Sequence, residues 1–98
     1  MQIALKTPIQ THAGPTKVLN LREPTGADFI QLKSLPFKVK GVAPNIEIDI
    51  DFALSAKWLS ALSGIDELLI GKMTRGDFIT AIGSMNELLV AEGADAGN

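Results

Sequence analysis

Residues 18–28, Val-Leu-Asn-Leu-Arg-Glu-Pro-Thr-Gly-Ala-Asp, predict the end of a β-strand followed at once by the start of an α-helix. Apolar and polar side chains alternate up to Arg22, which is the pattern of a half-buried strand. Pro24 has no backbone N–H for a β-ladder, so the strand ends before it. Thr25 and Asp28 have the spacing of a capping box, in which each side chain accepts a hydrogen bond from the other residue's backbone. This junction indicates a mixed α+β fold.

A second strand is predicted upstream of the junction. Ile3, Leu5 and Ile9 form an apolar stripe that resembles the inward face of a strand. Residues 10–16, Gln-Thr-His-Ala-Gly-Pro-Thr, supply the Gly and Pro of a chain reversal, so we expect an antiparallel hairpin with a rather long loop. Because a two-stranded hairpin is only marginally stable in water, it must pack on helices elsewhere in the chain.

The helix that begins at Thr25 is followed by a segment of mixed character. The helix is expected to end before Pro36, and its predicted buried stripe consists of Phe29, Ile30, Leu32 and Leu35. Residues 37–45 are interrupted by glycine and proline and predict no single element. Residues 46–52 alternate apolar and acidic side chains, which favours a third strand. In the alternative, Asp49 or Asp51 caps the next helix.

Two helices are predicted after this segment. The apolar spacing in residues 52–63 fits a helix of about three turns, and Gly64 is expected to end it as a left-handed cap. Residues 65–73 fit a second, short helix, with acids at its start and a lysine at its end. Trp58 lies on the apolar side of the first of these helices. It is expected in the core, with a role as an interface anchor as the alternative.

Thr74 and Asp77 repeat the Thr-x-x-Asp cap and open a last helix over residues 75–90. Apolar side chains cover more than half of its circumference. The fold class is therefore α+β, with an N-terminal antiparallel hairpin, and optionally a third strand, packed on three to four short helices. Residues 1–91 are expected to form a single domain, and the small and polar residues 92–98 a flexible tail.

Composition excludes several classes of function. The chain of 98 residues has room for one hydrophobic core, and its net charge of -2 gives no electrostatic reason to bind nucleic acid. It has no cysteine, which excludes disulfides and thiolate zinc sites and fits a reducing compartment. It begins without the pattern of an export signal and has no apolar run long enough for a membrane span. We therefore expect a cytoplasmic location.

The residues that catalysis or metal binding would need are scarce. The only histidine, His12, lies in the predicted Gly/Pro loop, where a solvated side chain is the expected role. Glu47, Asp49 and Asp51 lack the spacing of a calcium loop, and an acidic strand face is the simpler interpretation. The glycines do not form a phosphate-binding pattern. No catalytic residue, cofactor or metal is therefore predicted.

Three stretches occur in a particular order along the chain. They are residues 19–28, Leu-Asn-Leu-Arg-Glu-Pro-Thr-Gly-Ala-Asp; residues 59–65, Leu-Ser-Ala-Leu-Ser-Gly-Ile; and residues 69–78, which include Met-Thr-Arg-Gly-Asp-Phe. Together they resemble the small tail assembly chaperones of contractile-tailed phages. The resemblance extends from about Ile3 to Leu89, and residues 37–51 contribute least. Each motif alone is an ordinary helix cap, so the resemblance depends on their combination.

The resemblance implies a non-enzymatic protein that binds the tape measure protein while the tail tube polymerises around it. The tail tube protein is a further partner to be expected. Such a protein would be made in the cytoplasm of an infected or lysogenic bacterium and would be missing from the finished virion. The family often also includes a longer, frameshifted form with the same N-terminal domain.

The expected partner-binding surface lies on the last two helices. A long helical client needs its apolar stripe covered until assembly, and a small domain with surplus apolar helical surface can cover it. The residues expected to contribute are Leu68, Leu69, Phe78, Ile82, Met85, Leu88 and Leu89. The alternative for most of them is a place in the monomer's core. The same wide apolar face leaves a homodimer open.

Two other functions remain as alternatives. One is a structural phage protein, of the tail or of the head–tail joint, that is retained in the virion. The other is a regulatory module in which residues 74–76 form the turn of a helix-turn-helix. The last helix has no Lys or Arg after Arg75, which disfavours DNA recognition by it.

Overall fold

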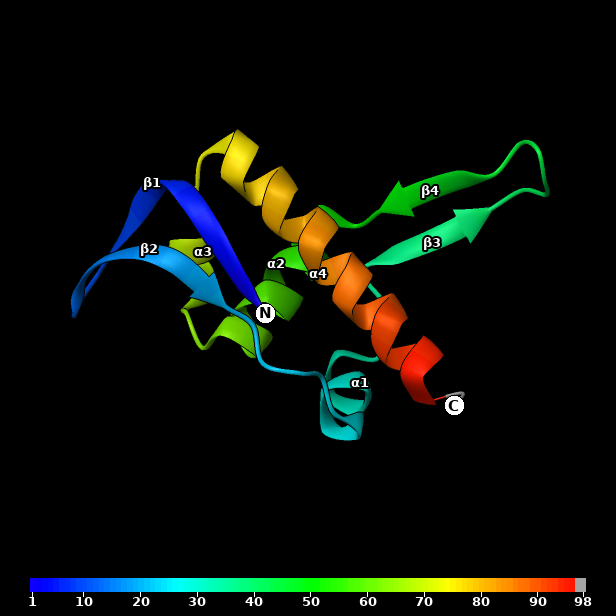
Figure 1. Cartoon of the computed structure of the whole chain (residues 1–98), viewed down its shortest axis with the longest axis horizontal. Coiled ribbons are helices and arrows are strands. Elements are labelled where there is room, and N and C mark those ends of the chain that lie inside the picture. The colour runs from blue at the N-terminus through cyan, green and yellow to red at the C-terminus, as the bar shows by residue number, and fades with distance from the viewer. Residues whose placement is uncertain (97–98) are drawn as a thin grey trace.

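The structure, a computed structural model, describes the backbone of residues 1–96 and the side chains of residues 1–90. Its elements in chain order are β1 (Gln2–Thr11), β2 (Gly14–Asn20), α1 (Gly26–Leu32), β3 (Phe37–Lys40), β4 (Glu47–Ile50), α2 (Phe52–Ser63), α3 (Glu67–Ile70) and α4 (Arg75–Ala96). Figure 1 shows two separate hairpins, β1–β2 and β3–β4, on opposite sides of the helices. The predicted α+β class, with its N-terminal hairpin, is confirmed.

The β1–β2 hairpin turns more tightly than the sequence predicts. Thr11 pairs with Gly14, so the turn consists of His12 and Ala13 alone. The Thr11 hydroxyl donates a hydrogen bond to the Gly14 carbonyl oxygen at 2.7 Å and accepts one from the Ala13 N–H at 3.2 Å. The side chain of Thr11 thus ties the two strands at the turn, and Gly14 and Pro15 belong to β2.

A bulge interrupts the middle of β1. Ala4 pairs with Val18, whereas the next pair is Ile9 with Thr16, so residues 5–8 lie opposite one residue of β2. Extra residues of this kind bend a strand and leave some of its backbone groups without partners in the ladder. The backbone of β1 therefore needs hydrogen-bond acceptors from another part of the chain.

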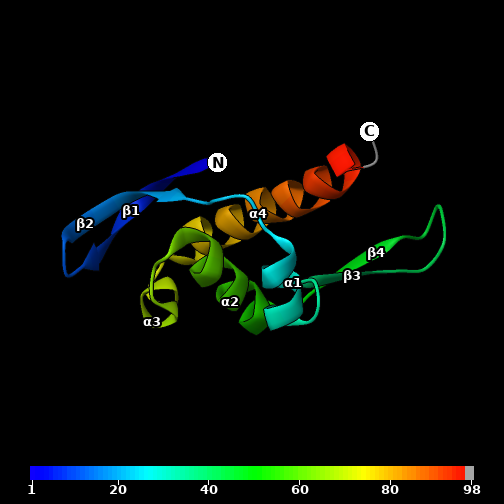
Figure 2. The same cartoon turned by 90° about the horizontal axis from the view of Figure 1, so that it is seen from below.

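The hydrophobic core lies between the first hairpin and helices α2, α3 and α4. Contacts join α3 and α4 to β1, and α2 to both β2 and α4. In Figure 2 the hairpin forms one layer, with α2 and α3 beneath it. The buried apolar residues are Ile3, Ile9, Leu19 and Leu21 from the hairpin and Trp58, Leu59, Leu62, Ile70, Ala81, Ile82, Met85 and Leu89 from the helices.

Trp58 is a core residue and joins α1 to α2. Its side chain is fully buried, and its indole Nε1–H donates to the Ser34 carbonyl oxygen at 2.9 Å. The ring of Phe29 meets it edge to face, with the ring centroids 5.1 Å apart. Buried indoles need such a partner for their N–H group. The expectation of a core position is confirmed over that of an interface anchor.

Helix α1 is shorter and more exposed than predicted. It ends at Leu32, because Lys33 adopts a left-handed conformation with φ 71°. The predicted buried stripe is wrong for Phe29 and Ile30, which are 37% and 79% exposed, and for Leu35, which lies beyond the helix and is also exposed. Helix α1 has two turns, and α2 is the only element with which it makes appreciable contacts in the described part of the chain. Only one side of α1 is therefore covered, which leaves Ile30 exposed.

The predicted bounds of α2 are confirmed at both ends. The Asp51 carboxylate accepts a hydrogen bond from the Leu54 N–H at 3.0 Å, which makes Asp51 the N-cap. Gly64 has a φ of 75° and is the left-handed C-cap that the sequence predicts. The following helix, α3, is a single turn that Asp66 caps by accepting from the Leu68 N–H.

Helix α4 begins at Arg75, as predicted from the Thr-x-x-Asp motif. The Asp77 N–H donates to the Thr74 hydroxyl at 3.3 Å, so Thr74 caps the helix. The predicted end at residue 90 is too early, because the backbone is helical through Ala96. The last part of the predicted tail, residues 97–98, lies outside the described residues.

The second hairpin, β3–β4, is the largest difference from the prediction. The strand expected over residues 46–52 is present as β4, but it pairs antiparallel with β3 and forms a sheet of its own. Phe37 pairs with Ile50 and Val39 with Ile48. Both views show this hairpin extending away from the rest of the molecule (Figures 1 and 2). The molecule is accordingly elongated, with extents of 45 × 27 × 21 Å.

Candidate functional site

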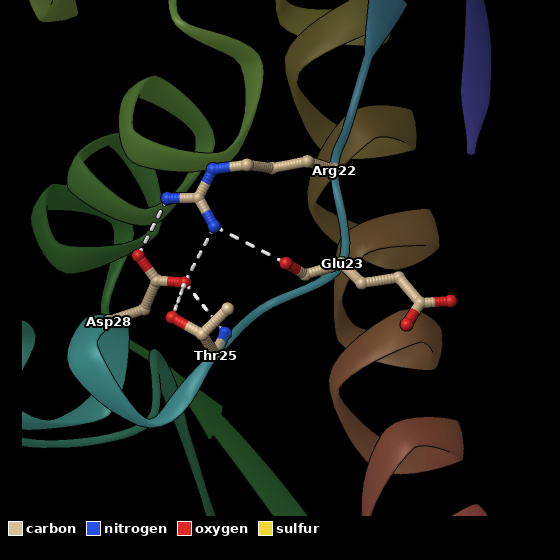
Figure 3. A network of polar contacts seen from close by, with 4 residues as sticks. All are labelled: Arg22, Glu23, Thr25 and Asp28. Carbon is tan, nitrogen blue, oxygen red and sulfur yellow. Dashed lines mark hydrogen bonds and ion pairs between the residues drawn. The ribbon is translucent and has the colours of Figure 1, made fainter.

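Arg22 and Asp28 fix the start of α1 to the end of β2. The Arg22 guanidinium donates two parallel hydrogen bonds of 2.7 Å to the Asp28 carboxylate (Figure 3). The same carboxylate accepts from the Thr25 N–H at 2.8 Å, which is the capping bond that the sequence predicts. These donors favour the ionised form, and Arg22 is the main reason why the pKa of Asp28 lies far below its ordinary value. The cluster is structural, and Pro24 beside it is buried.

Asp77 has a different role from the one its motif predicts. Its carboxylate oxygens accept hydrogen bonds from the backbone N–H groups of Lys6 at 3.0 Å and Thr7 at 2.9 Å. Both donors lie in the bulge of β1, where the ladder to β2 is interrupted. These two bonds are the main causes that lower the pKa of Asp77. The first turn of α4 therefore holds the N-terminal strand, and the reciprocal half of the predicted capping box is not formed there.

The residues predicted to bind a partner separate into three groups. Ile82, Met85 and Leu89 are buried in the core, with at most 5% of their surface exposed. Leu69, Phe78 and Leu88 are half-buried and pack against that core. Leu68 is 78% exposed. Only the last of these offers most of its side chain to a partner, because α4 uses its strongest apolar stripe to close the core.

One group of exposed apolar side chains lies on one face of the β3–β4 hairpin. By the alternation of a strand, Phe37, Val39, Ile48 and Ile50 lie on the same face. Val39 is 60% exposed and Ile48 is 64% exposed. The opposite face carries lysines on β3 and acids on β4, and the Lys40 ammonium lies 3.1 Å from the Asp49 carboxylate. The hairpin is therefore amphipathic, and its apolar face is exposed at Val39 and Ile48 and half-buried at Phe37 and Ile50.

A groove separates this apolar face from α4. It has a volume of about 380 Å³ and is lined by Phe37 and Ile48 from the hairpin and by Gly83, Asn86, Glu87 and Val90 from the helix. Most of its lining is apolar. We call it the hairpin–helix groove, and it is the candidate site for binding a partner.

Chemistry-bearing side chains do not converge in the described part of the chain. No three of its His, Asp and Glu residues lie close enough together to hold a metal ion. His12 is exposed in the first hairpin turn, and Asp51 serves as the cap of α2. Among the described helices, none has the length and apolar character needed to cross a membrane.

Comparison with known proteins adds no assignment. No protein-family model matches the chain, nor does any curated protein or solved structure. The functional argument accordingly depends on the sequence motifs and on the geometry of the hairpin–helix groove.

The sequence contains one further signal for the groove, the complementary charges of the two segments that become β3 and β4. Residues 37–40 alternate apolar and basic side chains, and residues 47–50 alternate acidic and apolar ones. Paired antiparallel, such segments place lysines opposite acids, which stabilises the pair. Gly41 and the proline at position 44 lie in the connection between them and mark a turn. Charge complementarity between the two segments would have predicted β3.

Proposed function

We propose that this chain is a non-enzymatic tail assembly chaperone of a contractile-tailed phage, which binds the tape measure protein in the host cytoplasm while the tail tube is built. Two observations support the proposal. The motifs at residues 19–28, 59–65 and 69–78 resemble those of that family. The β3–β4 hairpin has an apolar face that the described part of the chain leaves exposed at Val39 and Ile48. The second observation carries the proposal, because it supplies a surface for a client.

As an isolated element the hairpin has little stability of its own. Two strands without a covering layer are marginally stable in water, and contiguous exposed apolar surface favours aggregation unless it serves an interaction. A long helical client has the same problem, because its apolar stripe stays exposed until the tube forms around it. Binding between the two removes both apolar surfaces from water.

Co-purification with the tape measure protein of the same phage tests the proposal. The two chains are co-expressed, the client is captured by an affinity tag, and the beads are washed at physiological salt. We expect this chain to remain bound in roughly stoichiometric amounts. Recovery of the client alone would contradict the proposed function.

A pair of double variants locates the surface in the same assay. Val39→Ser with Ile48→Ser makes the apolar face of the hairpin polar and should abolish capture. The control double variant, Ile30→Ser with Leu68→Ser, changes two apolar residues on α1 and α3 that are 79% and 78% exposed, more than Val39 and Ile48. It should leave capture unchanged. Equal loss in both double variants would show that the hairpin is not the specific surface.

Analysis of purified virions distinguishes the alternative function. A chaperone leaves before the particle is complete, so mass spectrometry of virions should detect the tube and tape measure proteins without this chain. Retention at a fixed number of copies in each particle would identify it as a structural protein of the tail or of the head–tail joint.

A further inference from the structure

Gly83 lies in the interior of α4, where nothing in the described part of the chain requires a glycine. Glycine in a helix interior destabilises the helix relative to alanine, because it loses more backbone freedom on folding. Apart from the backbone of its own helix, a Cβ atom at position 83 would meet no described atom within 4 Å, and the φ angle is not in the left-handed region. The isolated chain would therefore be more stable with a larger residue there.

The position of Gly83 in the fold gives a reason for a glycine there. It lines the hairpin–helix groove, with Glu87 one turn later on the same side of α4. Where a helix has no side chain, another backbone can approach it closely. Because Gly83 has no side chain, a second helix in the groove could approach the backbone of α4 closely at this position.

Among the residues that line the groove, one is charged, and it selects the kind of helix that fits. After Arg75 the sequence has four acids, Asp77, Glu87, Glu92 and Asp95, and no Lys, Arg or His. Asp77 is committed to the bulge of β1, whereas Glu87 lines the groove. A ligand with basic residues beside its apolar stripe complements this wall. The α4 helix of a second copy would bring acid against acid, which disfavours self-association through the groove.

We propose that the hairpin–helix groove binds an amphipathic helical segment of the client, with an apolar stripe flanked by Lys or Arg, and that Gly83 lets the backbone of that segment pack against α4. This inference rests on the proposed function, because it takes the client to be the tape measure protein. It adds the location of the site and the chemistry of the segment that occupies it.

Peptide binding tests the chemistry of the segment. Fluorescein-labelled synthetic peptides of about 20 residues, long enough to form several helical turns, are taken in overlapping steps from the tape measure sequence. Their binding to the full chain is followed by fluorescence anisotropy. We expect the peptides that bind to share an apolar i, i+3/i+4 stripe with adjacent Lys or Arg, and to bind more weakly as salt rises. Tight binding confined to acidic or non-amphipathic peptides would overturn the proposal.

A matched pair of glycine variants tests the place of binding. Gly83→Leu fills the groove, whereas Gly76→Leu makes the same change in the first turn of the same helix, where a Cβ also meets open space. The loss of an interior glycine should raise the melting temperature of Gly83→Leu by about 3–6 °C. The same variant should bind the peptides at least about tenfold more weakly, and Gly76→Leu should bind as the original chain does. A variant that is more stable but binds less well cannot owe its loss to unfolding.

The outcomes separate the groove from the function. If Gly83→Leu binds the peptides as tightly as the original chain, the groove proposal fails while the proposed function stands. If the original chain binds neither the peptides nor the whole tape measure protein, both fail. A dimer of the original chain that Gly83→Leu converts to a monomer would show that a second copy occupies the groove and would overturn the proposal. Glu87→Gln should reduce the salt dependence of peptide binding, and an unchanged salt dependence would contradict the charge argument.

Discussion

Two buried aspartates connect the beginnings of helices to strands. The Asp28 carboxylate accepts two hydrogen bonds from the guanidinium of Arg22, just after β2. The Asp77 carboxylate accepts two hydrogen bonds from backbone N–H groups in the bulge of β1. In both cases the donors stabilise the ionised carboxylate and lower its pKa. Each of these carboxylates therefore contributes to stability only while it is ionised.

Acid should weaken this contribution in a defined pH range. The folded-state pKa values of both aspartates are lower than the value of about 3.9 for an unfolded Asp. Their contribution is fully present above that value and is lost as the pH falls toward the folded-state values. We expect Asp77→Asn to lower the melting temperature at about pH 7, because the asparagine amide has one acceptor oxygen for two N–H donors.

Thermal unfolding followed by circular dichroism checks this prediction. The difference in melting temperature between the original chain and Asp77→Asn should shrink between about pH 7 and pH 3, because the aspartate loses its advantage as it protonates. Ile9→Val removes a buried methyl group in the same strand, β1, and should lower the melting temperature equally at both pH values. A pH-independent difference for Asp77→Asn would show that its charge does not matter.

The β3–β4 hairpin is an element with a strict requirement at its connection. Gly41 has a φ of 85°, in the left-handed region, and a Cβ there would clash with the carbonyl oxygen of Asn45. Glycine is the residue that tolerates both conditions. The hairpin lies away from the core, so distortion of this connection should remain local.

We expect Gly41→Ala to loosen the hairpin without unfolding the body of the protein. The strain of an alanine at positive φ is on the order of 1 kcal/mol or more and falls on an element that contributes little to the core. Hydrogen–deuterium exchange should become faster in residues 37–50, while the melting temperature stays within about 2 °C of the original. A large fall in the melting temperature would show that the hairpin supports the core.

Elements with local signals were predictable from the sequence, and those that depend on distant partners were not. The bounds of α2 follow from Asp51, the apolar spacing and Gly64, all of which act within the helix itself. The pairing of β3 with β4, and the bulge that recruits Asp77, depend on contacts that periodicity does not report. The two Thr-x-x-Asp motifs make the limit clear, because identical local patterns place Asp28 and Asp77 in different roles.

At the scale of the whole molecule, the core and the exposed apolar surface lie in different places. The predicted partner-binding stripe of α4 closes the core against β1 and α2. Exposed apolar side chains lie on the second hairpin and along the groove beside it, and single ones such as Ile30 and Leu68 lie elsewhere. The sequence therefore indicated a surplus of apolar residues but not which of them would be left outside, because that division depends on how the elements pack.

Alanine variants measure this division. Met85→Ala should destabilise the protein by about 2–5 kcal/mol, because it leaves a cavity beside fully buried neighbours. Leu68→Ala, at an exposed position, should change the free energy of unfolding by about 0.5 kcal/mol or less. Urea unfolding of both variants gives the two values. Similar losses would place Leu68 in an interface that is already formed in the free protein.

The hydrogen bonds from Lys6 and Thr7 to Asp77 also bear on how the protein folds as it is synthesised. Lys6 and Thr7 are synthesised before their acceptor and remain without it until some 70 further residues have been added. A nascent chain that stops short of α4 would hold a bent hairpin with two unmatched amides and half a core. The hairpin and its core are thus completed only when α4 has been synthesised and closes over β1.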